Sequence, residues 1–152
     1  MYFDKVLEAA NKRLSIMTNK RYELVRQTEA TSRQGKTGLD LDVRDSYTGK
    51  AREASSLSGG ESFQASLALA LGLSDTVQAC AGGIQLDTIF IDEGFGSLDP
   101  ESLQLAIRIL NDLTESNKLV GIISHVEELK ENIDRKIIVN KTRTGSQLHV
   151  EI

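Results

Sequence analysis

Two adjacent carboxylates follow an uninterrupted apolar stretch near the middle of the chain. Residues 88–91 have the β-branched and aromatic composition of a buried strand, and Asp92 and Glu93 come directly after them. Carboxylates at the end of a buried strand lose hydration, which a cation or a reacting water can compensate. One carboxylate can hold a divalent cation while the other takes a proton from water, provided that the chain turns at Glu93, as Gly94 permits. An ordinary acidic turn is the alternative for this pair taken alone.

A serine, two glycines and a glutamate, residues 58–61, precede a long stretch rich in alanine and leucine. Ser58 and Glu61 have the spacing of a capping box, so a well-capped helix start is one interpretation. Gly59 and Gly60 are unfavourable at a helix start unless something must come close to the backbone. Exposed N–H groups at the positive end of a helix, together with the Ser58 hydroxyl, would suit phosphate oxygens. The motif therefore indicates either a structural cap or a phosphate site.

Two further polar groups accompany these motifs. Asp99 and Pro100 fit the N-cap and the first position of a helix, which accounts for both residues structurally. His125 follows the apolar stretch 119–123. The carboxyl ends of parallel strands lie at one edge of a sheet, so His125 is expected near Asp92, where it could contact a phosphate. A histidine satisfied by structural contacts is the alternative.

One segment resembles a phosphate-binding P-loop but lacks a residue that the motif requires. Gly35, Lys36 and Thr37 imitate the end of a P-loop, but the pattern G-x-x-x-x-G-K-T requires glycine at position 30, where the chain has Ala30. A buried strand pattern before the loop is missing as well. The chain by itself is therefore expected to bind ATP weakly and to hydrolyse it hardly at all.

The segments between these motifs predict an α/β fold. Helices are expected from about residue 60, from residue 100 and, shorter, from residue 126. Apolar strands at 86–91 and 119–123 alternate with these helices, which indicates a parallel sheet covered on both faces. Alternating residues predict two antiparallel strand pairs, 22–26 with 39–43 across a long polar loop, and 136–139 with 148–152 around a turn at 144–146.

The N-terminal segment has its own apolar pattern. Its apolar residues are spaced by four and three, as in a two-heptad coiled-coil seam: Phe3, Leu7, Ala10, Leu14 and Met17. A plain amphipathic core helix is equally compatible with this pattern. Residues 1–52 hold 11 Lys and Arg against 7 Asp and Glu, whereas the whole chain has a net charge of −4. This segment is either an ordinary solvated face or a surface that faces DNA.

Composition restricts the class of protein. With 152 residues, 39% of them hydrophobic and 26% charged, the chain suits one globular domain. Cys80 is the single cysteine, so neither a disulfide framework nor a cysteine-based zinc site is expected. A stretch of about 18 apolar residues, which a membrane span requires, is missing, so we expect no membrane partner. These features favour a cytoplasmic protein.

The order of residues 58–61, the acid pair, Asp99 and His125 resembles the C-terminal lobe of ATP-binding cassette (ABC) ATPases. Within that group, residues 62–75, 92–99 and 123–129 look like the SbcC family, the ATPase subunits of the SbcCD exonuclease. The resemblance implies the C-terminal lobe of an ABC-type P-loop ATPase head, with a parallel sheet core flanked by helices. Residues 1–20 would be the base of a returning coiled-coil helix, and residues 21–152 the head lobe.

The resemblance also implies roles for the motif residues. A signature loop would close over ATP held by a second head, and its residues would be Ser58, Gly59, Gly60 and Glu61. Asp92 would hold Mg²⁺, Glu93 would be the general base, and His125 would sense the γ-phosphate. Asp99 would lie in the D-loop that joins the two ATP sites.

The implied partners are the protein's own N-terminal P-loop lobe, a second head in an ATP-dependent homodimer, an SbcD-type nuclease and double-stranded DNA. Mn²⁺ is expected only in the nuclease. ATP hydrolysis would control a DNA double-strand exonuclease in repair and recombination. The resemblance also implies a nucleoid-associated location. A chromosome ATPase head of the SMC type, the nucleotide-binding lobe of an ABC transporter and an α/β domain without catalysis are the alternatives.

Overall fold

Four α-helices and seven strands make up the part of the chain that the structure describes. The computed structural model describes residues 2–27, 40–80, 86–116 and 118–151. The helices are α1 (Tyr2–Met17), α2 (Gly59–Cys80), α3 (Pro100–Glu115) and α4 (Glu127–Asn132). The strands are β1 (Tyr22–Arg26), β2 (Leu41–Asp45), β3 (Lys50–Glu53), β4 (Thr88–Asp92), β5 (Leu119–Ile123), β6 (Lys136–Thr142) and β7 (Gly145–Glu151). Single turns of 3-10 helix lie at Ala54–Ser56 and Phe95–Ser97.

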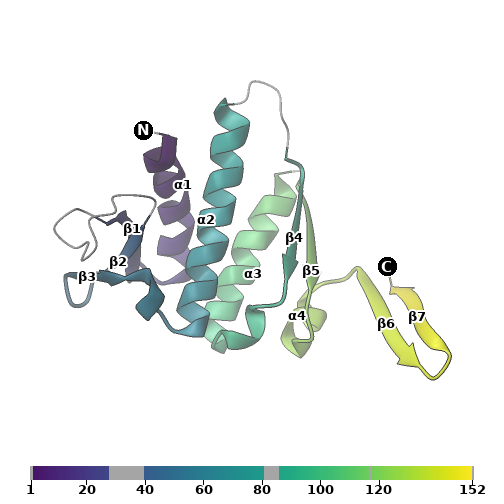
Figure 1. The fold of residues 1–152 in the computed structure, drawn as a ribbon. Coiled ribbons are helices and arrows are strands. Elements are labelled where there is room, and N and C mark those ends of the chain that lie inside the picture. The colour runs from purple at the N-terminus through teal and green to yellow at the C-terminus, as the bar shows by residue number, and fades with distance from the viewer. Residues whose placement is uncertain (1, 28–39, 81–85, 117, 152) are drawn as a thin grey trace.

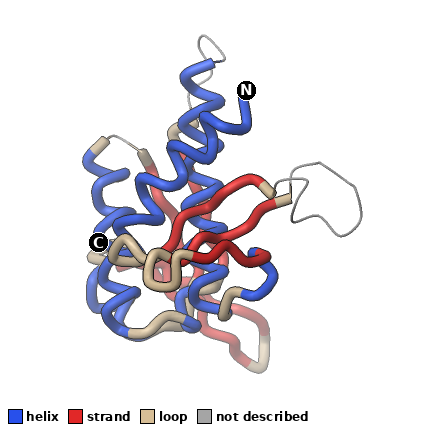
Figure 2. Tube along the Cα trace, turned by 90° about the vertical axis from the view of Figure 1, so that its left-hand side faces the viewer, coloured by secondary structure: helices blue, strands red, loops and turns tan. Residues whose placement is uncertain are grey.

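Three helices form the centre of the molecule. In Figure 1, α1, α2 and α3 lie side by side, with the antiparallel sheet β1–β2–β3 next to α1 and the parallel pair β4–β5 next to α3. Figure 2 views the molecule from the side of the antiparallel sheet, whose strands lie in front of the helices. The hairpin β6–β7 projects from the body beyond β5. The predicted α/β fold is therefore confirmed.

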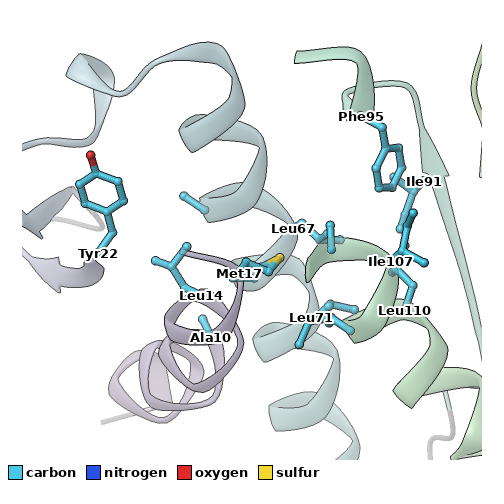
Figure 3. Close-up of a cluster of buried hydrophobic side chains, with 14 of the residues drawn as sticks. Ala10, Leu14, Met17, Tyr22, Leu67, Leu71, Ile91, Phe95, Ile107 and Leu110 are labelled. Atoms are coloured by element: carbon cyan, nitrogen blue, oxygen red, sulfur yellow. The ribbon is translucent and has the colours of Figure 1, made fainter. Parts of the chain in front are cut away.

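The core is one apolar cluster supplied mainly by the three central helices. Figure 3 shows members from α1 (Ala10, Leu14, Met17), α2 (Leu67, Leu71), α3 (Ile107, Leu110), β4 (Ile91) and the following turn (Phe95). Four of the five residues of the predicted N-terminal seam are buried in this cluster: Leu7, Ala10, Leu14 and Met17. The amphipathic core helix describes these contacts, whereas the assignment of residues 1–20 to a coiled-coil base stays a prediction.

A glycine allows α1 and α2 to pack unusually closely. A Cβ at Gly72 of α2 would lie 2.6 Å from the backbone nitrogen of Ala10 and 2.7 Å from the carbonyl oxygen of Val6. Both neighbours are backbone atoms of α1, so they cannot rotate away. The helix axes can approach this closely only because position 72 carries no side chain.

The predicted strand pairs are confirmed. β1 pairs antiparallel with β2, β6 pairs antiparallel with β7, and β4 pairs parallel with β5, with Asp92 opposite Ile123. The sequence analysis missed β3, which pairs antiparallel with β2. Its residues, Lys-Ala-Arg-Glu, do not alternate between apolar and polar, so the pattern gave no signal.

The prediction that both faces of the parallel sheet are covered is wrong for the part of the chain that the structure describes. Ile89 and Ile91 face the core, but Phe90 between them is 73% exposed. On β5, Ile123 is also exposed. The Phe90 ring lies over Gly121, where a Cβ would come within 2.5 Å of it. The apolar sequence of β4 predicted that both faces of the strand pair are buried, whereas only one face is buried among the described residues.

Several sequence-based expectations fall on residues outside the described ranges. They include the false P-loop with Ala30 and residues 35–37, the predicted polar loop between the first two strands, and the part of residues 1–52 that spans 28–39. Cys80 is a free, exposed thiol at the end of α2. Within the described ranges, no helix combines the length and the apolar character needed to cross a bilayer.

We expect Gly72→Ala to destabilise the chain, although alanine is normally the better helix former. The added methyl group would meet fixed backbone of α1, and overpacking of this kind lowers the free energy of unfolding by about 1–3 kcal/mol. Ser66→Ala, at an exposed position of the same helix, should leave stability unchanged or raise it slightly. Urea denaturation followed by circular dichroism would measure both, and a Gly72→Ala chain as stable as the parent would refute the packing argument.

Candidate functional site

The acid turn, residues 92–94, follows β4 directly and reverses the chain within a few residues. Glu93 adopts a left-handed backbone conformation, with φ of 58°, and Gly94 follows with φ of 96°. A non-glycine residue in this region costs on the order of 1 kcal/mol or more, so other contacts must hold it. One such contact is the hydrogen bond from the Glu93 N–H to the carbonyl oxygen of Ile123, at 2.9 Å. The predicted turn at Glu93 is therefore confirmed, and Glu93 itself makes the first left-handed step.

The turn brings Glu93 to His125. The Oε2 atom of Glu93 and the Nδ1 atom of His125 are 3.0 Å apart, so the ring nitrogen can donate a hydrogen bond to the carboxylate. His125 follows β5, the parallel neighbour of β4, and the prediction that both residues share one sheet edge is confirmed. The contact leaves Glu93 Oε1 and His125 Nε2 available for other partners. An acid and a base placed in this way can move a proton.

Asp92 and Glu93 are both exposed, which corrects one expectation. The sequence analysis expected carboxylates that had lost their hydration, but the outer face of β4 is uncovered and water reaches both side chains. Among the described residues, no group of three or more histidines, cysteines or acids is close enough to hold a metal ion. Asp92 does offer a hard carboxylate oxygen, the ligand type that Mg²⁺ prefers when phosphates and waters supply the rest.

The glycine turn, residues 58–61, begins α2 with the predicted capping box. The Glu61 N–H donates to Ser58 Oγ at 3.3 Å, and the Ser58 N–H donates to Glu61 Oε2 at 2.9 Å. Each residue thus satisfies one backbone donor of the other. The Ser58 hydroxyl keeps its own proton, so it can donate to a phosphate oxygen while it accepts from Glu61.

The two glycines of this turn differ in how much space a side chain would find at their positions. A Cβ at Gly60 would lie 2.6 Å from the carbonyl oxygen of Ser97, so packing within the chain excludes a side chain there. A Cβ at Gly59 would meet only the Cβ of Ser97, at an ordinary 3.7 Å. Packing against Ser97 is thus a second reason for glycine at position 60, and the role of both glycines in binding phosphate stays a prediction. Gly59 is the position at which the backbone stays open to a ligand.

Glu61 has further partners that the sequence analysis missed. Its Oε1 accepts a hydrogen bond of 2.6 Å from the hydroxyl of Tyr22, and Arg52 lies 3.7 Å from Oε2. Partial burial favours the neutral carboxyl, but the hydrogen bonds from Tyr22 and Ser58 outweigh it and hold the pKa of Glu61 below its ordinary value. Tyr22 stands 39 positions away on β1, a separation that carries no recognisable motif.

Asp99 caps α3 as predicted. Its two carboxylate oxygens accept from the Ser102 N–H at 2.9 Å and from the Ser102 hydroxyl at 2.7 Å. These hydrogen bonds, led by the one from the backbone, hold the pKa of Asp99 below its ordinary value. The cap accounts for the residue structurally, and its role in a D-loop stays a prediction.

An aromatic contact joins the acid turn to α2. Phe63, one turn into α2, packs edge-to-face on Phe95, with 4.8 Å between the ring centroids. The ring of Phe63 also occupies the space that a Cβ on Gly94 would need. Together with the contact between Gly60 and Ser97, this packing holds the glycine turn, the 3-10 turn Phe95–Ser97 and the acid turn as one corner of the molecule.

The comparison with known protein families gives one clear match. The model of a family described as SbcC/RAD50-like, Walker B motif, matches residues 28–112, which include the glycine turn and the acid turn. The SbcC component of nuclease SbcCD from Vibrio cholerae serotype O1 is 58% identical over 97% of this chain. The corresponding SbcC proteins from Staphylococcus saprophyticus and Treponema pallidum are 49% and 48% identical over the same share of the chain. The chain spans only 14% of the length of each relative.

Solved structures with the same fold include those of SMC ATPases. A structure described under ATP-driven dimerization and DNA-stimulated activation of SMC ATPases matches with a TM-score of 0.74 and 13% identity, over 97% of this chain and 84% of that one. The SMC head domain from Thermotoga maritima matches with a TM-score of 0.62 and 19% identity, over 96% and 47%. These identities establish the fold alone. The family model, which matches more than half of the chain, establishes that this chain belongs to the SbcC/RAD50-like family.

Proposed function

We propose that this chain is the C-terminal half of an ABC-type ATPase head of the SbcC type. It would hydrolyse ATP only after a P-loop lobe and a second head complete the site. The proposal rests mainly on the contact between Glu93 and His125, which lies beside Asp92 at the carboxyl edge of a parallel strand pair. Ligands of open α/β sheets bind at this edge.

The three residues at the edge would divide the hydrolytic work. Glu93 would accept a proton from the attacking water through Oε1, because His125 already engages Oε2. With both ring nitrogens protonated, His125 could donate to Glu93 from Nδ1 and to the γ-phosphate from Nε2. Asp92 would hold Mg²⁺, which when bound neutralises phosphate charge as the bond to the leaving group breaks.

The glycine turn would serve ATP held by the second head. The first N–H groups of α2 have no acceptor within the helix, and the helix dipole is positive at this end. Ser58 and Gly59 present a hydroxyl and an open backbone to an anion. Gly60 and Glu61 would complete the same nucleotide-binding loop, whose shape the contacts with Ser97 and Tyr22 support from within the chain. Asp99 would lie where the two ATP sites meet.

Exposed apolar surface on this chain supports the proposal that a P-loop lobe packs against it. Phe90, Leu119 and Ile123 lie on the uncovered face of β4–β5. On the projecting hairpin, four exposed residues pair across the strands on one face: Ile137 with Val150, and Val139 with Leu148. Contiguous apolar surface of this kind marks an interaction site. We infer that the P-loop lobe of the same head covers it.

The wider assembly follows from the relatives at 48–58% identity, which are named as components of the SbcCD nuclease. We infer that the complete protein forms an ATP-dependent homodimer, controls an SbcD-type nuclease and acts on double-stranded DNA in repair and recombination. Residues 1–20 would begin at the base of a coiled coil, and Mn²⁺ would bind only in the nuclease. The identities favour this assembly over an SMC-type chromosome ATPase or a transporter lobe.

ATP turnover tests the proposed half-site. The chain purified alone should turn over ATP hardly at all, and turnover should appear when it is coexpressed with a matching P-loop lobe. Glu93→Gln in the assembled head should lower kcat by about 10²–10⁴-fold, because the amide can still accept from His125 but cannot take a proton. Glu131→Gln, an exposed position on α4, is the matched control. Robust turnover by the lone chain, or full activity of Glu93→Gln, would overturn the assignment.

Copurification of the two lobes tests the apolar face. Phe90→Glu should weaken association with the P-loop lobe at least about tenfold, because the carboxylate would have to lose water against apolar surface. The lone chain should stay folded, since Phe90 is 73% exposed. Tyr47→Glu changes an equally exposed aromatic residue, at 76%, beside the antiparallel sheet and should leave association unchanged. Equal affinities of the two variants would show that this face does not bind the lobe.

A further inference from the structure

The hydroxyl of Tyr22 reaches the glycine turn from a different part of the fold. Tyr22 begins β1 and is buried, and Figure 3 shows its ring at the edge of the core, with the hydroxyl oxygen directed away from the apolar cluster. This hydroxyl donates to Glu61 Oε1 at 2.6 Å, while Glu61 Oε2 accepts from the Ser58 N–H. One carboxylate therefore connects β1 with the first residue of the glycine turn.

The position of Tyr22 is itself firmly fixed. The Asn11 side chain of α1 both donates to the carbonyl oxygen of Leu24 and accepts from its N–H, at 2.9 and 2.8 Å, and so holds β1 on the helix. Buried Gln64 of α2 donates to the carbonyl oxygen of Met17 at the end of α1, at 2.8 Å. The frame that carries Tyr22 is thus tied to the helix that carries Glu61.

The balance of burial, hydrogen bonds and charges around the pair favours an ionised Glu61 and a neutral Tyr22, although Arg21 and Arg52 by themselves lower the pKa of Tyr22. The guanidinium of Arg52 lies beside Glu61 and donates to the carbonyl oxygen of Ser56, just before the glycine turn. Arg21 packs on the Tyr22 ring, 4.7 Å from its centroid. Burial, followed by the hydrogen bond to Glu61, raises the pKa of Tyr22. A hydrogen bond to a charged acceptor is among the stronger ones in proteins.

We propose that Tyr22 is a positioning residue for ATP-dependent closure of the head: through Glu61 it holds the glycine turn in the shape that meets the second head's nucleotide. The inference rests on the proposed function for its ATP step and on this structure for its geometry. Tyr22 does not touch the reacting atoms. It places a hydroxyl and a backbone that do, and Arg52 supports the same carboxylate from its other oxygen.

The geometric part can be tested on this chain without nucleotide. Tyr22→Phe removes one oxygen atom, and we expect amide hydrogen exchange at residues 58–61 to quicken by at least about fivefold as the link to Glu61 is lost. Tyr47→Phe removes a hydroxyl from an exposed tyrosine and is the matched control. Unchanged exchange in Tyr22→Phe would overturn the proposal.

A spectroscopic titration reports on the same contact. The chain has three tyrosines and no tryptophan, so tyrosinate absorbance is easily followed. The absorbance that Tyr22→Phe removes should titrate above the ordinary tyrosine pKa of about 10, because burial and the hydrogen bond to Glu61 both favour the neutral phenol. The contribution of neutral Tyr22 to stability is therefore present below pH 10 and lost as the pH rises through the raised pKa, whereas the contribution of ionised Glu61 is lost as the pH falls through its lowered pKa. In Glu61→Gln the pKa of Tyr22 should fall, and an unmoved titration would contradict the link.

Steady-state kinetics of the assembled head test the consequence. Tyr22→Phe should raise the ATP concentration for half-maximal turnover about tenfold and change kcat less than about twofold, because closure is impaired while Glu93 and His125 are untouched. Combination with Glu61→Gln should add little further, since both changes break one link. If the parent head hydrolyses no ATP, the proposed function fails, and hydrogen exchange still decides the role of Tyr22. A parent-like ATP requirement in Tyr22→Phe would overturn the inference.

Discussion

The backbone contact between Gly60 and Ser97 sets the geometry on which the rest of the candidate site depends. The start of α2 lies so close to the turn after β4 that a Cβ would fall 2.6 Å from a carbonyl oxygen. Phe63 closes the same corner by packing on Phe95 and over Gly94. Because close-packed groups transmit displacement, the turn that would serve one nucleotide cannot shift independently of the acid turn that would serve another. The two proposed half-sites would thereby be joined within a single chain.

The acid turn concentrates backbone strain at the residue proposed to act as base. Glu93 takes a left-handed conformation that glycine would adopt more easily, yet its carboxylate is the group that reaches His125. The hydrogen bond from its N–H to β5 and the following Gly94 hold the turn in place. Strain that surrounding contacts maintain is common where a side chain must be aimed, and here it aims a carboxylate along the sheet edge.

The molecule has a well-packed core on one side and exposed apolar side chains on the other. α1, α2 and α3 bury a continuous core, while the outer face of β4–β5 and one face of the β6–β7 hairpin leave apolar side chains in water. The same exposure leaves Asp92 and Glu93 hydrated, so neither carboxylate has the dry surroundings that strengthen electrostatic catalysis. Covering this face would complete the core and the site together.

The helices, the strand pairs other than β2–β3, the capping box and the shared edge of Glu93 and His125 can all be predicted from the sequence, because periodicity and strand ends are local signals. The sequence overestimated the burial of β4. An apolar run shows that a strand needs to be covered on both faces, but not whether the same chain or another one covers it. The folded structure was needed to show that Ser97 leaves no room for a side chain at Gly60, and that Tyr22 and Arg52 hold Glu61. These contacts join residues far apart in the chain, and no local spacing encodes where separate elements meet in space.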